Sequence, residues 1–581
     1  MVKILKYIFL LTIFFCNYKT FADTISEPIL CQRINLLFII KDKKRALETS
    51  IQAINQFPQS LEIKKLYVQA LSQCGYSSEA LQVWDKIKNE LSDSKEIATI
   101  QECIAWGVLS TGKSSPQIEI KNLSLLSSFL TQDARVSEML LHALHSSNVT
   151  QRALGIRLAA KYGNAELYRV IINLLKTEQV SFVRKELIEA IGTARIIEGK
   201  EILENILAMD TEVAEKYSAI NSLSLLSENL QLEQITALLL HPSASFRLLG
   251  IEIIHRLSIE ALYPMLFELL QDPSLDVKIA VLKVIGLHTP SQWSLEQKNA
   301  VKAYCFDANP FVSLLAAWNC LLQEEDIGKS IFIEKIESSN PSIRRFASAL
   351  LSFTGCKGVP LIIVIFKSTK DPYVRVNLAR GLLSLRILVK EASSALLHFI
   401  EDVQAPIMWD KGQYIFFPMI SPSTIAPTPL CHNLRAVIDG MSRLSLLNNL
   451  LVIEPSLAIK AARNYLHNHF WGLSGNAAAM LMETGDTYCV DLVKNLLNDS
   501  NKKIRLQAAL VLAFLHQDEA AAKVLEELYY TVRQEDRFYI LEALGQLSAK
   551  ESIPFLMKLL EEPFMGIRMA AASIVIQNLY H

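Results

Sequence analysis

ALYPMLFELLQDPSLDVKIAVLKVIG, residues 261–286, is the stretch that decides the fold class. Its first half places four apolar residues at the i, i+3, i+4, i+7 spacing of one helix face: Leu262, Met265, Leu266 and Leu269. Asp272-Pro273 then breaks the helix, and a second apolar stripe follows: Val277, Val281, Val284 and Ile285. The stretch therefore predicts two amphipathic helices. Neither can bury its stripe alone, so the pair must stack on similar neighbours.

The helix pair recurs along most of the chain. A similar sequence pattern appears in GVPLIIVIFKSTKDPYVRVNLARGLLSL (358–385) and SIPFLMKLLEEPFMGIRMAAASIVI (552–576). One position opens each second helix: Arg152, Arg184, Lys216, Arg247, Lys278, Ser313, Arg344, Arg375, Arg505, Arg537 and Arg568. Most neighbouring positions are 31 or 32 residues apart. A sustained period of this length predicts an all-α protein, an α-solenoid of stacked helix pairs.

This pattern resembles HEAT repeats, in particular the short HEAT-like type also found in phycobilin lyases, over most of residues 136–581. The resemblance implies an armadillo-like helical superhelix, with HEAT-like repeats in 131–400 and 434–581. In such proteins the repeated cations usually form a ladder between units, facing turn carboxylates such as Asp272, Asp371 and Asp499. A charged row that binds a partner is the alternative interpretation.

The N-terminal region carries a different repeat. In residues 45–87, Ala46-Leu47, Ala53-Ile54 and Pro58 precede Ala70-Leu71 and Ala80-Leu81 at helix-turn-helix spacing. This stretch resembles tetratricopeptide repeats, a family that holds peptides or partner proteins. We assign residues 23–130 to a helical region of this type.

An insertion interrupts the HEAT-like period between Arg375 and Arg505, which are 130 residues apart. Its sequence is EDVQAPIMWDKGQYIFFPMISPSTIAPTPLCHN, residues 401–433, and its prolines exclude helix. Four aromatic residues predict that this loop packs against something: Trp409, Tyr414, Phe416 and Phe417. Two interpretations stay open: the loop covers the solenoid's own groove, or these residues bind a partner.

The last helix, residues 564–580, has the apolar composition of an internal repeat helix. A solenoid normally ends in a cap with a polar outer face. We therefore expect one uncovered apolar flank, with Ile574 and Ile576 as candidate binding residues for a partner or for a second copy of the chain.

The N-terminus has the pattern of a secretory signal peptide, residues 1–22. Lys3 and Lys6 precede an apolar run, and Thr20-Phe21-Ala22 forms a small-residue cleavage site. Bulky Phe15 before Cys16 argues against a lipoprotein. We expect export to a bacterial periplasm or cell envelope, no integral membrane span, and mostly free, buried cysteines.

The sequence motifs that could indicate catalysis, nucleotide binding or metal binding are weak. GVLSTGKS, residues 107–114, matches a phosphate-binding loop, but the residues before it have helical rather than strand periodicity, and Gly112 suggests a helix C-cap. The chain has no His-Glu dipeptide of the kind that binds iron in HEAT-repeat hydroxylases, and His467 and His469 would diverge on a helix. We assign no catalytic, cofactor-binding or metal-binding residue.

The charge balance argues against nucleic acid as a partner, because 58 Lys and Arg face 59 Asp and Glu. We therefore predict an exported, non-enzymatic scaffold that binds other proteins or peptides. The alternative is a lyase- or hydrolase-like enzyme on the same scaffold. A closed polar pocket beside residues 401–433 would favour the enzyme, and an open groove would favour the scaffold.

Overall fold

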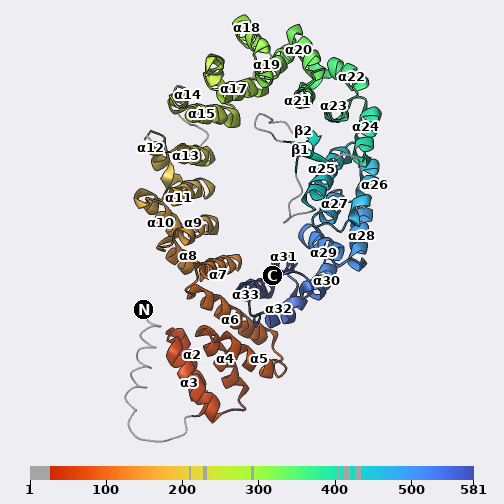
Figure 1. The fold of residues 1–581 in the computed structure, drawn as a ribbon. Helices are drawn as coiled ribbons and strands as arrows, with labels where there is room; N and C mark the ends of the chain where they lie inside the picture. The colour runs from red at the N-terminus through yellow and green to blue at the C-terminus, as the bar shows by residue number, and fades with distance from the viewer. Residues whose placement is uncertain are drawn as a thin grey trace. The chain divides into compact units, whose positions relative to one another are not determined.

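The computed structural model describes residues 26–208, 211–226, 232–288, 293–402, 406–410, 419–425 and 433–580. The predicted signal peptide, residues 1–22, lies outside the described residues. Apart from two short strands, the regular elements of the described chain are helices, which confirms the all-α solenoid (Figure 1). The contacts divide the chain into a terminal unit, formed by the residues up to Thr131 and those from Lys550 onward, and a central unit, Gln132–Ala549.

The terminal unit combines helices from both ends of the chain. Its elements are α2 (Glu27–Ile39), α3 (Lys43–Gln56), α4 (Leu61–Gln73), α5 (Ser77–Ile87), α6 (Ser94–Lys113), α7 (Ile118–Leu130), the 3-10 helix η7 (Lys550–Ser552), α32 (Ile553–Leu559) and α33 (Met565–Tyr580).

The central unit is built of helix pairs. The first helices are α8 (Val136–Leu144), α10 (Ala165–Thr177), α12 (Lys200–Ala208), α14 (Leu232–Leu239), α16 (Tyr263–Glu268), α18 (Leu295–Ala303), α20 (Asp326–Ile336), α22 (Val359–Ser368), α24 (Val389–Glu401), α26 (Pro455–Leu466), α28 (Thr487–Asn495) and α30 (Ala520–Tyr529). The second helices are α9 (Val149–Tyr162), α11 (Ser181–Thr193), α13 (Val213–Leu226), α15 (Ala244–Leu257), α17 (Leu275–His288), α19 (Pro310–Leu322), α21 (Pro341–Leu351), α23 (Pro372–Ser384), α25 (Leu434–Leu451), α27 (Leu473–Met482), α29 (Lys502–His516) and α31 (Gln534–Gln546). Short 3-10 turns join them: η1 (Ile197–Gly199), η2 (Glu260–Leu262), η3 (Leu269–Gln271), η4 (Tyr304–Phe306), η5 (Gly355–Gly358) and η6 (Leu496–Asn498).

The deciding stretch, 261–286, forms its two helices as the stripes require. Leu262 and Leu266 of the first stripe are buried, and the four residues of the second stripe are all buried. The helix break falls at Asp272-Pro273, between η3 and α17. The first helix is shorter than predicted, because 3-10 turns replace α-helix at both of its ends.

Second helices stack on one another along the central unit, as α9 on α11, α11 on α13 and α15 on α17. In Figure 1 they line the inner side of this unit, and the first helices lie outside them. This arrangement gives each internal pair of the unit two neighbours that cover its apolar stripes.

Some of the repeated arginines form the predicted ladder between units, whereas Arg375 and Arg537 lie over the rings of Phe366 and Tyr529. Arg247 in α15 pairs with Asp272 in the next unit's turn through Nε at 2.6 Å, and its Nη1 donates to the carbonyl oxygens of His241 and Pro242 in its own turn. Arg152 with Glu178 and Arg344 with Asp371 have the same arrangement, and Arg184 pairs with Glu215 in the first turn of α13. Asp499 departs from it, since its partner is His467. The ladder therefore stabilises the stack.

The described part of the insertion is an antiparallel hairpin of β1 (Ile407–Asp410) and β2 (Met419–Pro422), in the register Ile407 to Pro422. Strand β1 contacts α25, and β2 contacts α21 and α23. Ile407 and Ile420 are buried there. The hairpin thus bridges the second helices on either side of the insertion.

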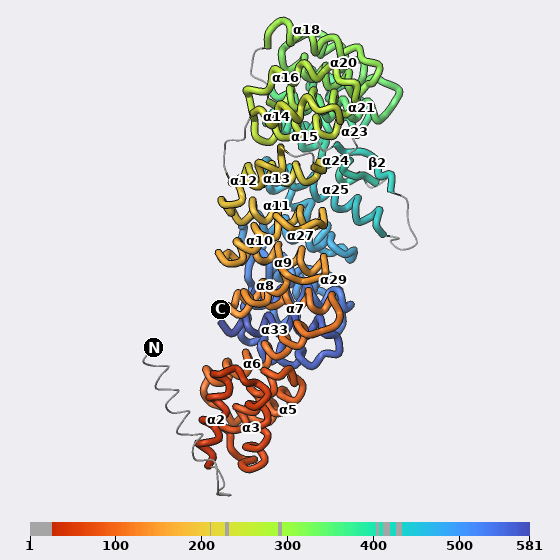
Figure 2. The backbone as a smooth tube through the Cα atoms, turned by 90° about the vertical axis from the view of Figure 1, so that its left-hand side faces the viewer, coloured from red at the N-terminus to blue at the C-terminus, as the bar shows by residue number. Residues whose placement is uncertain are grey.

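The C-terminal helix α33 packs against α6 and α7 within the terminal unit (Figures 1 and 2). Ser573 Oγ donates to the Ser127 carbonyl oxygen at 2.7 Å, across 446 residues of sequence. Ile574 is only 6% exposed and Ile576 only 2%. The expected uncovered flank is therefore wrong at these two candidate binding residues, because helices from the N-terminal part of the chain cover them.

The stretch that matches a phosphate loop lies inside a continuous helix, α6, which ends at Lys113. Its glycines serve close packing: a Cβ at Gly107 would lie 2.7 Å from the Ser72 carbonyl oxygen, and one at Gly112 would overlap Met569 of α33. The assignment of Gly112 as a C-cap is wrong, since Ser114 caps the helix. The required strand-loop-helix setting is absent at this stretch.

Candidate functional site

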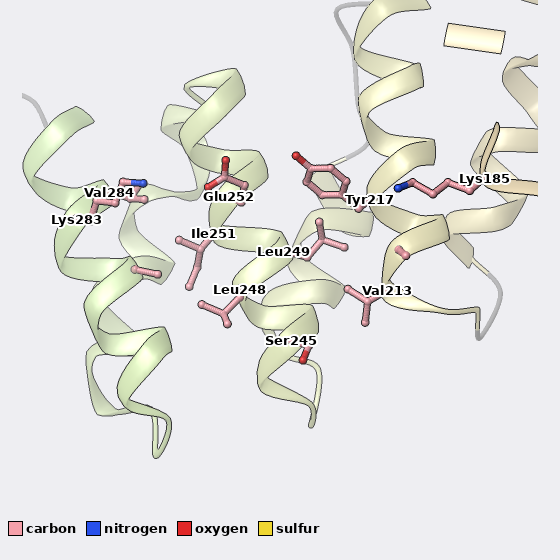
Figure 3. Close-up of a pocket in the computed structure, with 12 residues that line it drawn as sticks. Lys185, Val213, Tyr217, Ser245, Leu248, Leu249, Ile251, Glu252, Lys283 and Val284 are labelled. Carbon is pink, nitrogen blue, oxygen red and sulfur yellow. The ribbon is translucent and has the colours of Figure 1, made fainter. Parts of the chain in front are cut away.

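A groove of about 550 Å³ runs across four consecutive second helices, α11, α13, α15 and α17 (Figure 3). Apolar side chains form much of its lining: Val213, Leu248, Leu249, Ile251 and Val284. Leu249, Ile251 and Val284 are buried in the helix stack, whereas Val213 and Leu248 are half-buried. The groove thus offers apolar surface at the inner side of the central unit.

Polar side chains follow one edge of this groove. Figure 3 shows Lys185, Tyr217, Glu252 and Lys283 in a row, each from a different helix, beside the apolar side chains. Arg256 extends the row, since its Nη1 donates to Tyr217 Oη at 3.1 Å and to Asn221 Oδ1 at 2.5 Å. The site therefore combines an apolar strip with a polar strip of both charges.

Two histidines meet beyond this polar edge, at the C-terminal ends of α15 and α17. His255 Nδ1 lies 2.5 Å from His288 Nε2. Burial, and then the positive charge of Lys283, lowers the pKa of both imidazoles. The pair is therefore held neutral in the folded chain, with one ring nitrogen donating to the other.

The repeat itself positions these side chains. Lys185, Tyr217 and Leu248 each follow a ladder position by one residue, and Glu252 and Lys283 each follow one by five residues. Equivalent positions on stacked helices face the same way, so they meet in one groove. The sequence analysis missed these residues, although reading down the equivalent positions of the aligned repeats would have found them.

Of the aromatic residues predicted to form a site, the structure describes Trp409, while Tyr414, Phe416 and Phe417 lie outside the described residues. Trp409 is half-buried, and the Arg380 guanidinium lies 4.5 Å from its ring centre. Burial lowers the pKa of Arg380 to about 10. The ring thus fastens the hairpin to α23, and its binding of a partner stays a prediction.

Two polar side chains hold the backbone of the hairpin. Asn377 is fully buried, and its Oδ1 accepts from the Ile420 amide at 3.1 Å while its Nδ2 donates to the Ile420 carbonyl oxygen at 3.4 Å. Asp439 Oδ1 accepts from the Ile407 amide at 2.7 Å. These side chains take the place of a neighbouring strand as hydrogen-bond partners of the hairpin. For the described strands, this supports the interpretation in which the loop covers the solenoid's own groove.

A second depression, of about 500 Å³, lies on the first helices α24 and α26, next to the start of the insertion. Its polar lining includes Lys390, Ser394, His398 and Glu401, which are all exposed. It is an open surface feature, unlike the closed pocket that would favour an enzyme.

Within the described ranges, no group of three or more His, Cys, Asp or Glu residues is arranged to hold a metal ion. His467 caps the end of α26, so the two-residue spacing to His469 lies outside a helix and the helical argument against a shared metal does not apply. Among the same residues, no helix has the length and apolarity needed to cross a bilayer.

The stacked two-helix units define the chain as an α-solenoid protein. The model of the PBS lyase HEAT-like repeat matches residues 536–562, which lie in α31 and α32. The match supports a HEAT-like repeat at these residues, and the other helix pairs of the described chain have the same two-helix architecture. A search of curated proteins finds no significant match.

Several solved structures match the chain at low identity. The Escherichia coli protein YibA is 16% identical, and the match covers 45% of this chain and 95% of YibA with a TM-score of 0.33. The complex of CpcE and CpcF of phycocyanin lyase from Nostoc sp. PCC7120 is 15% identical, with coverage of 39% and 92% and a TM-score of 0.24. Yeast importin-beta, Kap95p, is 13% identical, with coverage of 96% and 80% and a TM-score of 0.33.

Proposed function

We propose that this HEAT-repeat protein is an exported, non-enzymatic scaffold that binds a protein or peptide in the groove across α11, α13, α15 and α17. The observation that carries the proposal is the open groove itself, about 550 Å³ with an apolar lining and one polar edge. A segment of a partner can bury apolar side chains against the lining while its polar groups meet the edge.

The groove suits a macromolecular partner better than a small substrate. Its lining comes from four helices in a row, so it is extended along the stack rather than closed around one point. Small-molecule sites usually bury most of their ligand in a cleft, which an open row of helix faces does not do.

Site-specific photocrosslinking tests the binding site. A benzophenone amino acid replaces Tyr217 in the groove, and a control carries it at Tyr530, which is 59% exposed at the end of α30. We expect a discrete crosslinked protein from envelope extracts at Tyr217 and none at Tyr530. Leu248→Glu should abolish that product, whereas Val452→Glu, at a site 80% exposed, should leave it. Equal products at both tyrosines would refute the site.

Export requires a separate test, because it rests on residues 1–22 alone. These residues, fused to alkaline phosphatase lacking its own signal, should give active enzyme only outside the cytoplasm, and Ile8→Lys in the apolar run should abolish activity. An inactive wild-type fusion would refute export and leave the groove proposal standing. Chemical conversion of a captured partner would instead favour the lyase- or hydrolase-like alternative.

A further inference from the structure

Two cysteines with free thiols meet inside the unit of α18 and α19. Cys305 in η4 and Cys320 in α19 have their Sγ atoms 3.6 Å apart, 15 residues apart in sequence. Both are buried, with exposures of 1% and 2%. The expectation of mostly buried cysteines is wrong among the described residues, because only these two and Cys489 are buried, whereas Cys356 is exposed and three others are half-buried.

The fold keeps the two sulfurs together. Ser313 Oγ, near the start of α19, donates to the Cys305 carbonyl oxygen at 2.6 Å, which ties η4 to the helix that carries Cys320. A disulfide has an S–S bond of about 2.05 Å, so the sulfurs need to approach by about 1.5 Å from their 3.6 Å separation. We expect rotation of the two side chains to supply this movement.

The surroundings distinguish the two thiols. Either thiol can donate in the hydrogen bond between the two sulfurs; this hydrogen bond, and then the nearby Lys302 ammonium, lower the pKa of Cys305. The same hydrogen bond, with burial, raises the pKa of Cys320. Cys305 also has the nearby Lys302 ammonium, so we expect it to be the first nucleophile of the pair.

We propose that Cys305 and Cys320 form an intramolecular disulfide that fastens η4 to α19, with a small-molecule or protein disulfide as oxidant. The Cys305 thiolate attacks one sulfur of the oxidant and releases the other as a thiolate. The Cys320 thiolate then attacks Cys305 Sγ in the mixed disulfide, forms the internal bond and releases the second thiol. The protein loses two hydrogens and the oxidant gains two.

Local opening of η4 precedes the first step, because both sulfurs are buried. Once formed, the bond closes a short loop, which disfavours reopening of the turn. The proposal concerns the chemistry of the pair and does not depend on the partner-binding groove. An oxidising compartment outside the cytoplasm would supply the oxidant.

The test uses the purified chain in native buffer with oxidised glutathione. Lys302 and Lys329 flank both cysteines and no other Lys or Arg lies between them, so one tryptic peptide, residues 303–329, contains the whole pair. We expect this peptide to lose two hydrogens and to regain them with dithiothreitol. Amide exchange in α19 should slow at least tenfold in the oxidised protein.

Cys489 is the internal control, since it is also buried and should keep its free thiol under the same conditions. A stable glutathione adduct on Cys305 or Cys320 without the internal bond would overturn the proposal. So would a pair that stays reduced until denaturant is added. In the Cys320→Ser variant, the loss of two hydrogens should be replaced by a glutathione adduct on Cys305. This variant tests which cysteine attacks the oxidant first.

Discussion

Replacing Arg247 with alanine tests whether the row of arginines is a structural ladder or a binding surface. The Arg247 guanidinium contacts both carboxylate oxygens of Asp272, at 2.6 and 2.9 Å, and two carbonyl oxygens of its own turn. The side chains are 10% and 4% exposed. Burial acts to raise the pKa of Asp272, but the hydrogen bonds from Arg247 and the Ser274 amide outweigh it and lower that pKa. The carboxylate therefore depends on its partner.

Removal of one member of a buried ion pair costs about 3–5 kcal/mol, because the other charge stays buried without compensation. Arg247→Ala should therefore increase local opening of the α14–α17 region by about 10²- to 10⁴-fold, at about 1.4 kcal/mol per factor of ten. The increase in opening should stay close to the altered unit, because each repeat contacts only its neighbours in the array. Hydrogen exchange measured by mass spectrometry reports this opening peptide by peptide.

Lys329→Ala is the matched control. Its pair with Asp326 has a similar 2.9 Å separation, but the side chains are 51% and 91% exposed. Such a surface pair contributes about 0–1 kcal/mol. The double change Arg247→Met with Asp272→Leu should cost less than Arg247→Ala, because it leaves no unpaired charge. Unchanged exchange in Arg247→Ala, with loss of crosslinking at the groove, would refute the ladder and favour the binding row.

Three further predictions concern buried groups. Ile576→Glu places a carboxylate at a site 2% exposed and should loosen α33, seen as rapid proteolysis of the C-terminal segment rather than as a change in oligomeric state by light scattering. His255 and His288 have lowered pKa values in the folded chain, so the unfolded chain binds protons first as the pH falls through about 6.5. The free energy of unfolding should therefore decrease below that pH. In His288→Asn the thermal unfolding midpoint should change less between pH 7 and pH 5 than in the wild type, and an equal change in both proteins would contradict this. In the reduced native protein, Cys305 and Cys320 should resist alkylation that labels the exposed Cys356, and equal labelling rates would show that η4 opens freely.

The outcome at the C-terminus shows where local sequence information ends. The composition of residues 564–580 resembled that of an internal repeat helix, but the uncovered flank that we expected from it is wrong at Ile574 and Ile576. It could not identify the cover, because α6 and α7 lie more than 400 residues away in sequence and no repeat period relates them to α33. The structure supplies them, and Gly107 and Gly112 are small because helices approach closely there.

For the insertion, residues 401–433, the sequence likewise predicted some features and only the structure shows others. Its prolines excluded helix from the sequence alone, and the described strands agree. The hydrogen bonds of Asn377 and Asp439 to the hairpin backbone join residues that are 43 and 32 positions apart, and no spacing rule predicts them. The aromatic character of the loop predicted packing, and Trp409 against Arg380 confirms it for the one aromatic residue among the four that the structure describes.

The sequence by itself determined the helix pairs, their period of 31 or 32 residues and the ladder positions, because amphipathic spacing and helix breaks are local and each unit repeats them. Tertiary structure decided which side chains meet. The groove residues come from four units, the Cys305 and Cys320 sulfurs from two turns of one unit, and the cover of α33 from the other end of the chain. The physical reason is that equivalent positions of different repeats come together only when the helices stack. The helices that cover α33 are α6 and α7, and no residue near α33 in sequence specifies them.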